Sequence, residues 1–80
     1  MLTIKEAATR AATHLNDLIP GAKNIQLEEV ESTDYDKIWA ITLSYYEADS
    51  LFGGKCYKIL NVRKTDGEVL SMKIRSVRQQ

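Results

Sequence analysis

The chain has 80 residues, 44% of them hydrophobic and 28% charged, and its formal net charge at pH 7 is zero. This balance is typical of a folded globular protein and excludes an intrinsically disordered one. We expect a chain of this length to form one small domain over residues 1–80, with little interior volume for a deep catalytic cavity.

A helix is predicted at the start of the chain. Thr3 and Glu6 have the spacing of a capping box, in which each side chain binds the backbone amide of the other residue. At the helical period, apolar residues fall on one face and charged or hydroxyl residues on the other. The predicted apolar stripe consists of Ile4, Ala7, Ala8, Ala11, Leu15 and Leu18. Pro20 and Gly21 end the helix, because proline disfavours helical backbone at the residue before it.

Four antiparallel strands are predicted after the helix. The first covers residues 25–30, and its alternation of apolar and polar residues slips at Glu28-Glu29, which predicts a bulge or a frayed edge. The second strand begins near Trp39 and has the most regular alternation. A third strand runs from residue 55 to 64, and Gly67 supplies the positive φ of a tight turn into the last strand.

These elements predict an α+β fold, one N-terminal helix packed across a four-stranded antiparallel meander sheet, with Leu15 and Trp39 buried between the layers. Charge is unevenly distributed over the sheet. Residues 23–36 carry one lysine against five carboxylates, whereas residues 55–80 carry seven cations against two carboxylates. These charges form either solvated strand faces or a polarised surface that orients a partner.

The register of the third strand stays open. Tyr57 and Ile59 favour one face of the sheet. Leu60 and Val62 favour the other, so no single register buries all four without a bulge. We therefore expect the sheet face away from the helix to be partly apolar, a surface that a small monomer would cover. Its exposed residues would be Ile38, Ala40 and either Leu60 or Val62.

The loop over residues 50–54 contains two adjacent large apolar residues, Leu51 and Phe52, before a pair of glycines. They either fold back over the end of the core or anchor a protein partner. Together with the partly apolar sheet face, this loop predicts a homodimer or a complex with another protein, and we favour face-to-face sheet packing over pairing of edge strands.

The order of the elements resembles that of the PepSY-like small domains of bacteria, part of the wider cystatin-like group in which a sheet wraps a helix. The segments that carry the resemblance are Ile19-Pro20-Gly21-Ala22-Lys23, residues 38–43, Tyr57-Lys58-Ile59 and residues 64–70. The resemblance implies this fold, and it implies binding or inhibition of proteases, generally by secreted or membrane-bound proteins. Residues 31–36 lack the Gln-x-Val-x-Gly loop of true cystatins, so inhibition of cysteine proteases is not implied.

Catalytic and metal-binding motifs are sparse. Cys56 and His14 are the only candidates for a nucleophile and its base, and no local motif activates the thiol. The single cysteine excludes an intramolecular disulfide and a zinc-binding cysteine cluster. The acidic residues fit no calcium loop, and no glycine-rich phosphate loop occurs. We therefore expect no catalytic residue, no metal and no cofactor.

The sequence has neither a signal-peptide pattern nor an apolar stretch of the roughly 20 residues that span a bilayer, so we expect a cytoplasmic protein without membrane contact. The leading hypothesis is a non-catalytic protein-binding module, such as a small bacterial or phage inhibitor or immunity protein. Its predicted contact residues are Leu51, Phe52, Ile38, Ala40, Leu60, Lys73 and Arg75.

The alternative hypothesis is binding of single-stranded nucleic acid on a basic sheet surface, and an enzyme using Cys56 and His14 comes third. The residues of the basic surface would be Lys58, Arg63, Lys73 and Arg75, with Tyr46 and Tyr57 as stacking platforms. The zero net charge weighs against this alternative.

Overall fold

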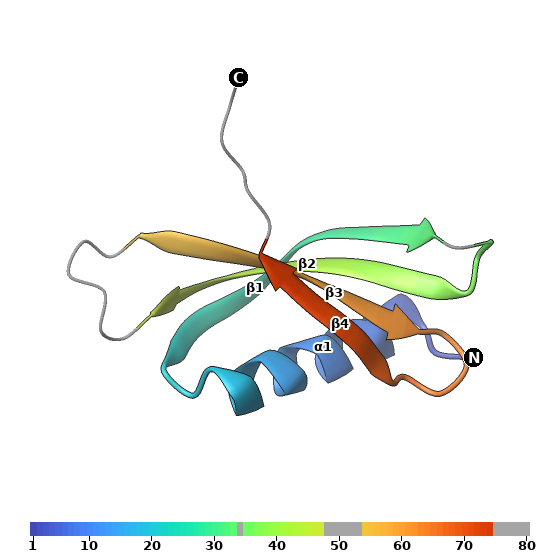
Figure 1. Ribbon diagram of the computed structural model, residues 1–80, viewed down its shortest axis with the longest axis horizontal. Helices are drawn as coiled ribbons and strands as arrows, with labels where there is room; N and C mark the ends of the chain where they lie inside the picture. The colour runs from blue at the N-terminus through green and yellow to red at the C-terminus, as the bar shows by residue number, and fades with distance from the viewer. Residues whose placement is uncertain (34, 48–53, 75–80) are drawn as a thin grey trace, which may run out of the picture.

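The computed structural model describes residues 1–33, 35–47 and 54–74. Its elements in chain order are helix α1 (Ile4–Leu18) and strands β1 (Ala22–Thr33), β2 (Ile38–Glu47), β3 (Lys55–Arg63) and β4 (Val69–Ile74). The sheet has the order β1-β2-β3-β4 with antiparallel neighbours, and α1 lies along one of its faces (Figure 1). The predicted α+β fold, one helix across a four-stranded antiparallel meander, is confirmed.

Helix α1 begins with the predicted capping box. The Thr3 amide donates to Glu6 Oε1 at 2.9 Å, and the Glu6 amide donates to Thr3 Oγ1 at 3.1 Å, so two amides that a helix leaves without partners are satisfied. The middle of the apolar stripe is buried, but its two ends are not. Ile4 is 46% exposed above the groove beside β1, and Leu18, the last helical residue, is 58% exposed.

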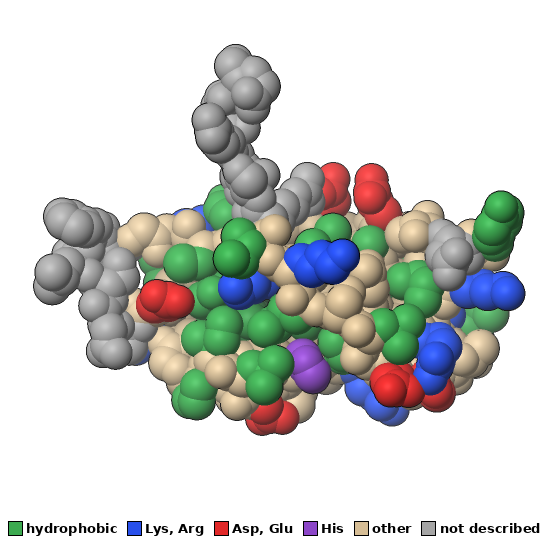
Figure 2. Space-filling view, in the orientation of Figure 1, with side chains coloured by type: hydrophobic (Ala, Val, Ile, Leu, Met, Phe, Trp, Pro, Cys, Tyr) green, Lys and Arg blue, Asp and Glu red, His purple; other side chains and the backbone are tan. Residues whose placement is uncertain are grey.

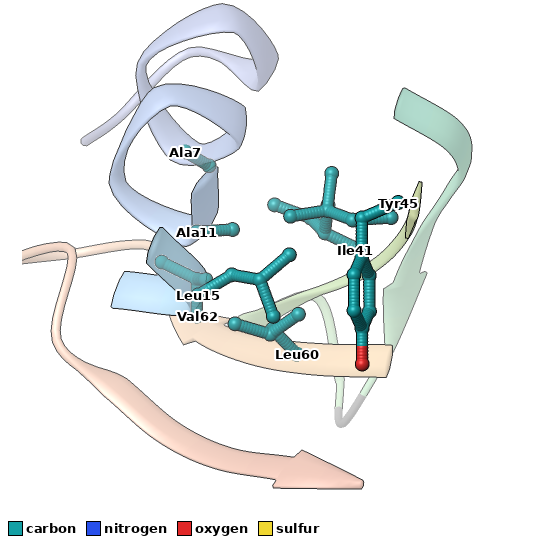
Figure 3. Packing of buried hydrophobic residues seen from close by; sticks show 8 residues of the cluster. Ala7, Ala11, Leu15, Ile41, Tyr45, Leu60 and Val62 are labelled. Atoms are coloured by element: carbon teal, nitrogen blue, oxygen red, sulfur yellow. The ribbon is translucent and has the colours of Figure 1, made fainter. Parts of the chain in front are cut away.

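The core lies between α1 and the two central strands. The hydrophobic side chains with at most 2% exposure come from the helix, from β2 and from β3. They are Ala7, Ala11, Leu15, Ile41, Leu43, Tyr45, Leu60 and Val62. Figure 3 shows Leu15 pointing from the helix toward Leu60, while the two alanines let the helix axis lie close to the sheet. Burial of Leu15 is therefore confirmed, whereas Trp39 is only half-buried at the rim of this cluster.

The expectation that Leu60 or Val62 faces away from the helix is wrong, because both side chains have 0% exposure in the core. β3 pairs with β2 without a bulge, and this register sets Leu60 opposite Ile41 on the face that the helix covers. Tyr57 and Ile59 alternate to the other face and remain half-buried there. The irregularity falls instead between β3 and β4, next to Val62.

β1 contains the predicted bulge. Its pairing with β2 shifts register between Lys23 and Gln26 and again between Leu27 and Glu29, and the strand is longer than predicted. Leu27 pairs with the core residue Leu43, so it belongs to the helix-covered face. Glu28 and Glu29 both follow on the opposite face, because a bulge places two residues of one strand against one residue of its neighbour.

The turn between β3 and β4 requires glycine, as predicted. Gly67 has a φ of 77°, a conformation that L side chains rarely adopt, and its amide donates to the Arg63 carbonyl at 2.8 Å. A Cβ atom at this position would lie 2.8 Å from Leu2 Cδ2. The turn is therefore closed against the N-terminal segment as well as against the strands.

Candidate binding surface

The sheet face that points away from α1 is the candidate binding surface, and we call it the open face. The strand registers define it, since residues that pair across antiparallel strands share a face. Its central residues are Glu28, Glu29 and Glu31 on β1, Ile38, Ala40, Thr42 and Ser44 on β2, Tyr57, Ile59 and Asn61 on β3, and Ser71 and Lys73 on β4.

Side-chain size differs sharply between the two central strands of the open face. β2 contributes the short side chains of Ala40, Thr42 and Ser44, which are buried between their neighbours. β3 contributes the taller Tyr57 and Ile59 directly opposite two of them. The open face therefore has a low column, formed by Ala40, Thr42 and Ser44 on β2, beside a high ridge, formed by Tyr57 and Ile59 on β3. This relief exists because β2 alternates core residues with small ones, whereas β3 alternates core residues with large ones.

The expected exposure of Ile38 and Ala40 is wrong, although both lie on the predicted face. They are only 9% and 7% exposed, because both lie on a central strand, where Ile38 is flanked by Thr33 and Arg63 and Ala40 by the longer Glu31 and Asn61. Two other predicted contact residues, Leu51 and Phe52, lie outside the described residues, as does Arg75. Lys73 is exposed on the open face.

Carboxylates line one border of the open face. Glu28 Oε2 accepts hydrogen bonds from Ser44 Oγ at 2.6 Å and from Lys55 Nζ at 3.4 Å. The ion pair between Glu28 on β1 and Lys55 on β3 therefore spans β2. The Ser44 hydrogen bond is the main reason that the pKa of Glu28 lies below its ordinary value. Partial burial raises this pKa, and the positive charge of Lys55 lowers it further. Glu28 in turn raises the pKa of Lys55. Figure 2 shows acidic side chains projecting at the upper edge, on the side of the sheet away from the helix.

The cations predicted for nucleic-acid binding do not form one surface in the described part of the chain. Lys58 pairs with Leu43 and therefore lies on the helix-covered face. Arg63 binds Asp66 at 3.0 Å and also Glu68, and these contacts raise the pKa of Arg63. Lys73, by contrast, makes no ion pair with any described residue. The border opposite the carboxylates thus carries Lys73 as its available positive charge.

Cys56 and His14 lie in different depressions. His14 borders a groove between the helix and the β3–β4 turn, with Asp17 and Gly67. Cys56 borders a depression beside Tyr45 at the other end of β3. Among the described residues, no three His, Cys, Asp or Glu side chains lie close enough to hold a metal ion. No helix in the described ranges is long and apolar enough to cross a membrane.

One cluster at the end of the sheet was not predicted from the sequence. Lys64 is only 3% exposed, and its ammonium lies 3.8 Å from the centre of the Trp39 ring. The same ammonium donates to Ser32 Oγ at 2.6 Å and to Asp36 Oδ1. Backbone bonds from Leu2 to Lys64 and from Lys64 to Lys37 add the N-terminal segment and the β1–β2 turn.

A signal for this cluster exists in the sequence. Lys64 continues the alternation of Leu60 and Val62, so its position is one that faces the helix. A lysine at such a position requires partners for its charge, and an aromatic ring and a carboxylate supply them. Asp36, with a φ of 69°, is held in place by its bonds to Lys64 and Ser32.

We expect an Asp36→Asn variant to lose less stability on acidification than the wild-type chain. Hydrogen bonds from Lys64 and then Ser32 hold the pKa of Asp36 below its ordinary value of 3.8. A carboxyl whose pKa is lowered on folding contributes stability above its unfolded pKa, and that contribution disappears as the pH falls through the folded value. Asparagine has no such titration. The effect should be small, because this side chain is 79% exposed.

Urea unfolding at neutral pH and at about pH 3 measures the difference. The matched control is the same substitution in a Lys64→Met background, where the main cause of the lowered pKa is gone and the benefit should shrink. An identical acid sensitivity of the wild-type chain and the Asp36→Asn variant would contradict the pairing.

Comparison of the chain with protein-family models, with curated proteins and with solved structures finds no match. Its function is therefore inferred from the geometry of the described residues.

Proposed function

We propose that the chain is a non-catalytic protein-binding module that uses the open face of its sheet. The observation that carries the proposal is a ridge of Tyr57 and Ile59 on a sheet face without a second layer among the described residues. Tyrosine and large apolar side chains supply binding energy at protein interfaces, and charged side chains belong to the rim. Here Glu29 and Lys73 lie at opposite borders of the open face.

Binding of protein is favoured over binding of nucleic acid by the distribution of charge. A nucleic-acid surface needs several cations on one face, whereas this face has a row of carboxylates on β1. The proposed role also accords with the resemblance to PepSY-like domains, which implies binding or inhibition of another protein. A small bacterial or phage inhibitor or immunity protein is the kind of molecule that we propose.

Photo-crosslinking tests the proposal. A photoreactive phenylalanine analogue at Tyr57 should give protein crosslinks in the native host or in concentrated solution, because this side chain stands on the ridge. The matched control carries the analogue at Thr13, which is exposed on the helix, on the other side of the sheet from the open face. Equal yields from the two positions, or crosslinks from Thr13 alone, would refute the proposal. Crosslinks from Tyr57 to nucleic acid would establish the alternative.

A further inference from the structure

We propose that the occupant of the open face is a second copy of this chain. The two sheets pack face to face about a two-fold axis that runs parallel to the strands and passes between β2 and β3. This inference rests on the proposed function and names its partner. It follows from the order of the strands, the shape of the face and the distribution of its charge.

Symmetry fixes which strands meet. A two-fold axis parallel to the strands keeps each residue at its position along the strand and reverses the order of strands across the sheet. With the order β1-β2-β3-β4, β2 of one copy then lies over β3 of the other, and β1 lies over β4. A two-fold axis perpendicular to the strands would instead set each strand over its own copy.

The parallel axis makes the shape self-complementary. It brings the ridge residue Ile59 of one copy over the short Thr42 of the other, because these two residues pair in one row of the sheet. Asn61 and Ala40 form the adjacent row and meet in the same way. Each copy therefore fills the low column of the other. The perpendicular axis would set ridge on ridge and leave the low columns empty, which close packing disfavours.

The same axis makes the charge complementary. Glu29, Thr42, Ile59 and Lys73 form one continuous row across the four strands. In the proposed dimer the Glu29 end of this row lies over the Lys73 end of the partner's row, and the contact occurs twice. Lys73 has no ion pair among the described residues, so it is available for it. The perpendicular axis would place the acidic strand of one copy over that of the other.

The size of the face predicts a weak dimer. Four strands about 4.8 Å apart and six residues of about 3.3 Å each cover roughly 19 by 20 Å. Such a patch of about 400 Å² per copy is smaller than the roughly 800 Å² per partner that stable interfaces bury, so association should be weak and depend on concentration. Packed sheets of this kind lie about 10 Å apart and cross at about −30°, which keeps the matched rows near each other at the centre.

Sedimentation velocity of the full chain, from micromolar to millimolar concentration, tests the inference with two charge variants. Glu29→Lys places a lysine at both ends of the row that runs from position 29 to position 73, and Lys73→Glu places a glutamate at both ends. We expect the wild-type chain to dimerise and each variant alone to dimerise about tenfold more weakly. An equimolar mixture of the two should regain wild-type affinity, because each new lysine then faces a new glutamate. Lys5→Glu, on the exposed side of the helix, makes the same charge change as Lys73→Glu and should have no effect.

Each other outcome overturns a distinct part of the inference. If each charge variant dimerises more weakly than the wild-type chain and their mixture does not regain wild-type affinity, the parallel axis is excluded. Dimers that neither variant weakens would exclude the parallel axis, because they would use either the perpendicular axis, which already sets like charges together, or another surface such as the apolar groove that Leu27 borders beside β1. A monomer at every concentration, with Tyr57 crosslinked to a different protein, would refute the second copy and leave the proposed function intact. A monomer without Tyr57 crosslinks would refute both.

Discussion

Replacing Leu15 by alanine is expected to lower the free energy of unfolding by about 3 kcal/mol. Leu15 has 0% exposure and packs where the helix meets the centre of the sheet (Figure 3). Its truncation removes apolar contacts and leaves a cavity, because Ala7 and Ala11 on the same helix face are too small to fill it. For an 80-residue domain, whose total stability is about 4–12 kcal/mol, this loss is a large fraction.

Leu18→Ala is the matched control, since it makes the same chemical change three residues further along the same helix. Leu18 is 58% exposed, so its truncation should change the stability by at most about 0.5 kcal/mol. Urea denaturation followed by circular dichroism measures both variants. Equal losses in the two variants would show that the helix does not pack on the sheet through Leu15.

Replacing Lys64 by alanine is expected to cost about 2–3 kcal/mol. The substitution removes an ammonium held over the Trp39 ring and its charge-assisted bonds to Ser32 and Asp36. It also removes an aliphatic stem that is almost fully buried. The loss exceeds that of a surface ion pair, because the aromatic ring and the burial of the ammonium limit screening by water.

A Lys64→Met variant separates charge from packing. Methionine retains most of the stem, and Asp36 stays solvated because its side chain is 79% exposed, so this variant should lose only about 1 kcal/mol. Lys55→Ala, which breaks the more exposed pair with Glu28, should melt close to the wild-type chain. Trp39, the single tryptophan, reports unfolding and should also change its emission in both Lys64 variants. Unchanged emission in Lys64→Ala would contradict contact between the ammonium and the ring.

The sequence by itself determined the elements and their order. The Thr3–Glu6 capping box, the stripe through Leu15 and the alternation from Trp39 onward are local patterns. Local patterns of this kind fix helix start, helix face and strand period, since each depends on neighbours only a few residues away. Gly67 belongs to the same class, because a positive φ in a tight turn selects glycine whatever surrounds it.

Only the tertiary structure decided which face each ambiguous residue occupies. Leu60 and Ile59 are both apolar, and their sides became clear only from the register that sets Leu60 opposite Ile41. Ala40 is buried by its neighbouring strands although no helix covers its face of the sheet. No pattern within its own strand indicates this burial.

The Lys64 cluster joins positions 28 residues apart in the chain, Asp36 and Lys64, so no local spacing predicts it. The rows of the open face likewise combine single residues from four strands. Register, rather than composition, places Glu29 and Lys73 at opposite ends of one row, because pairing of strands is a contact between segments distant in sequence.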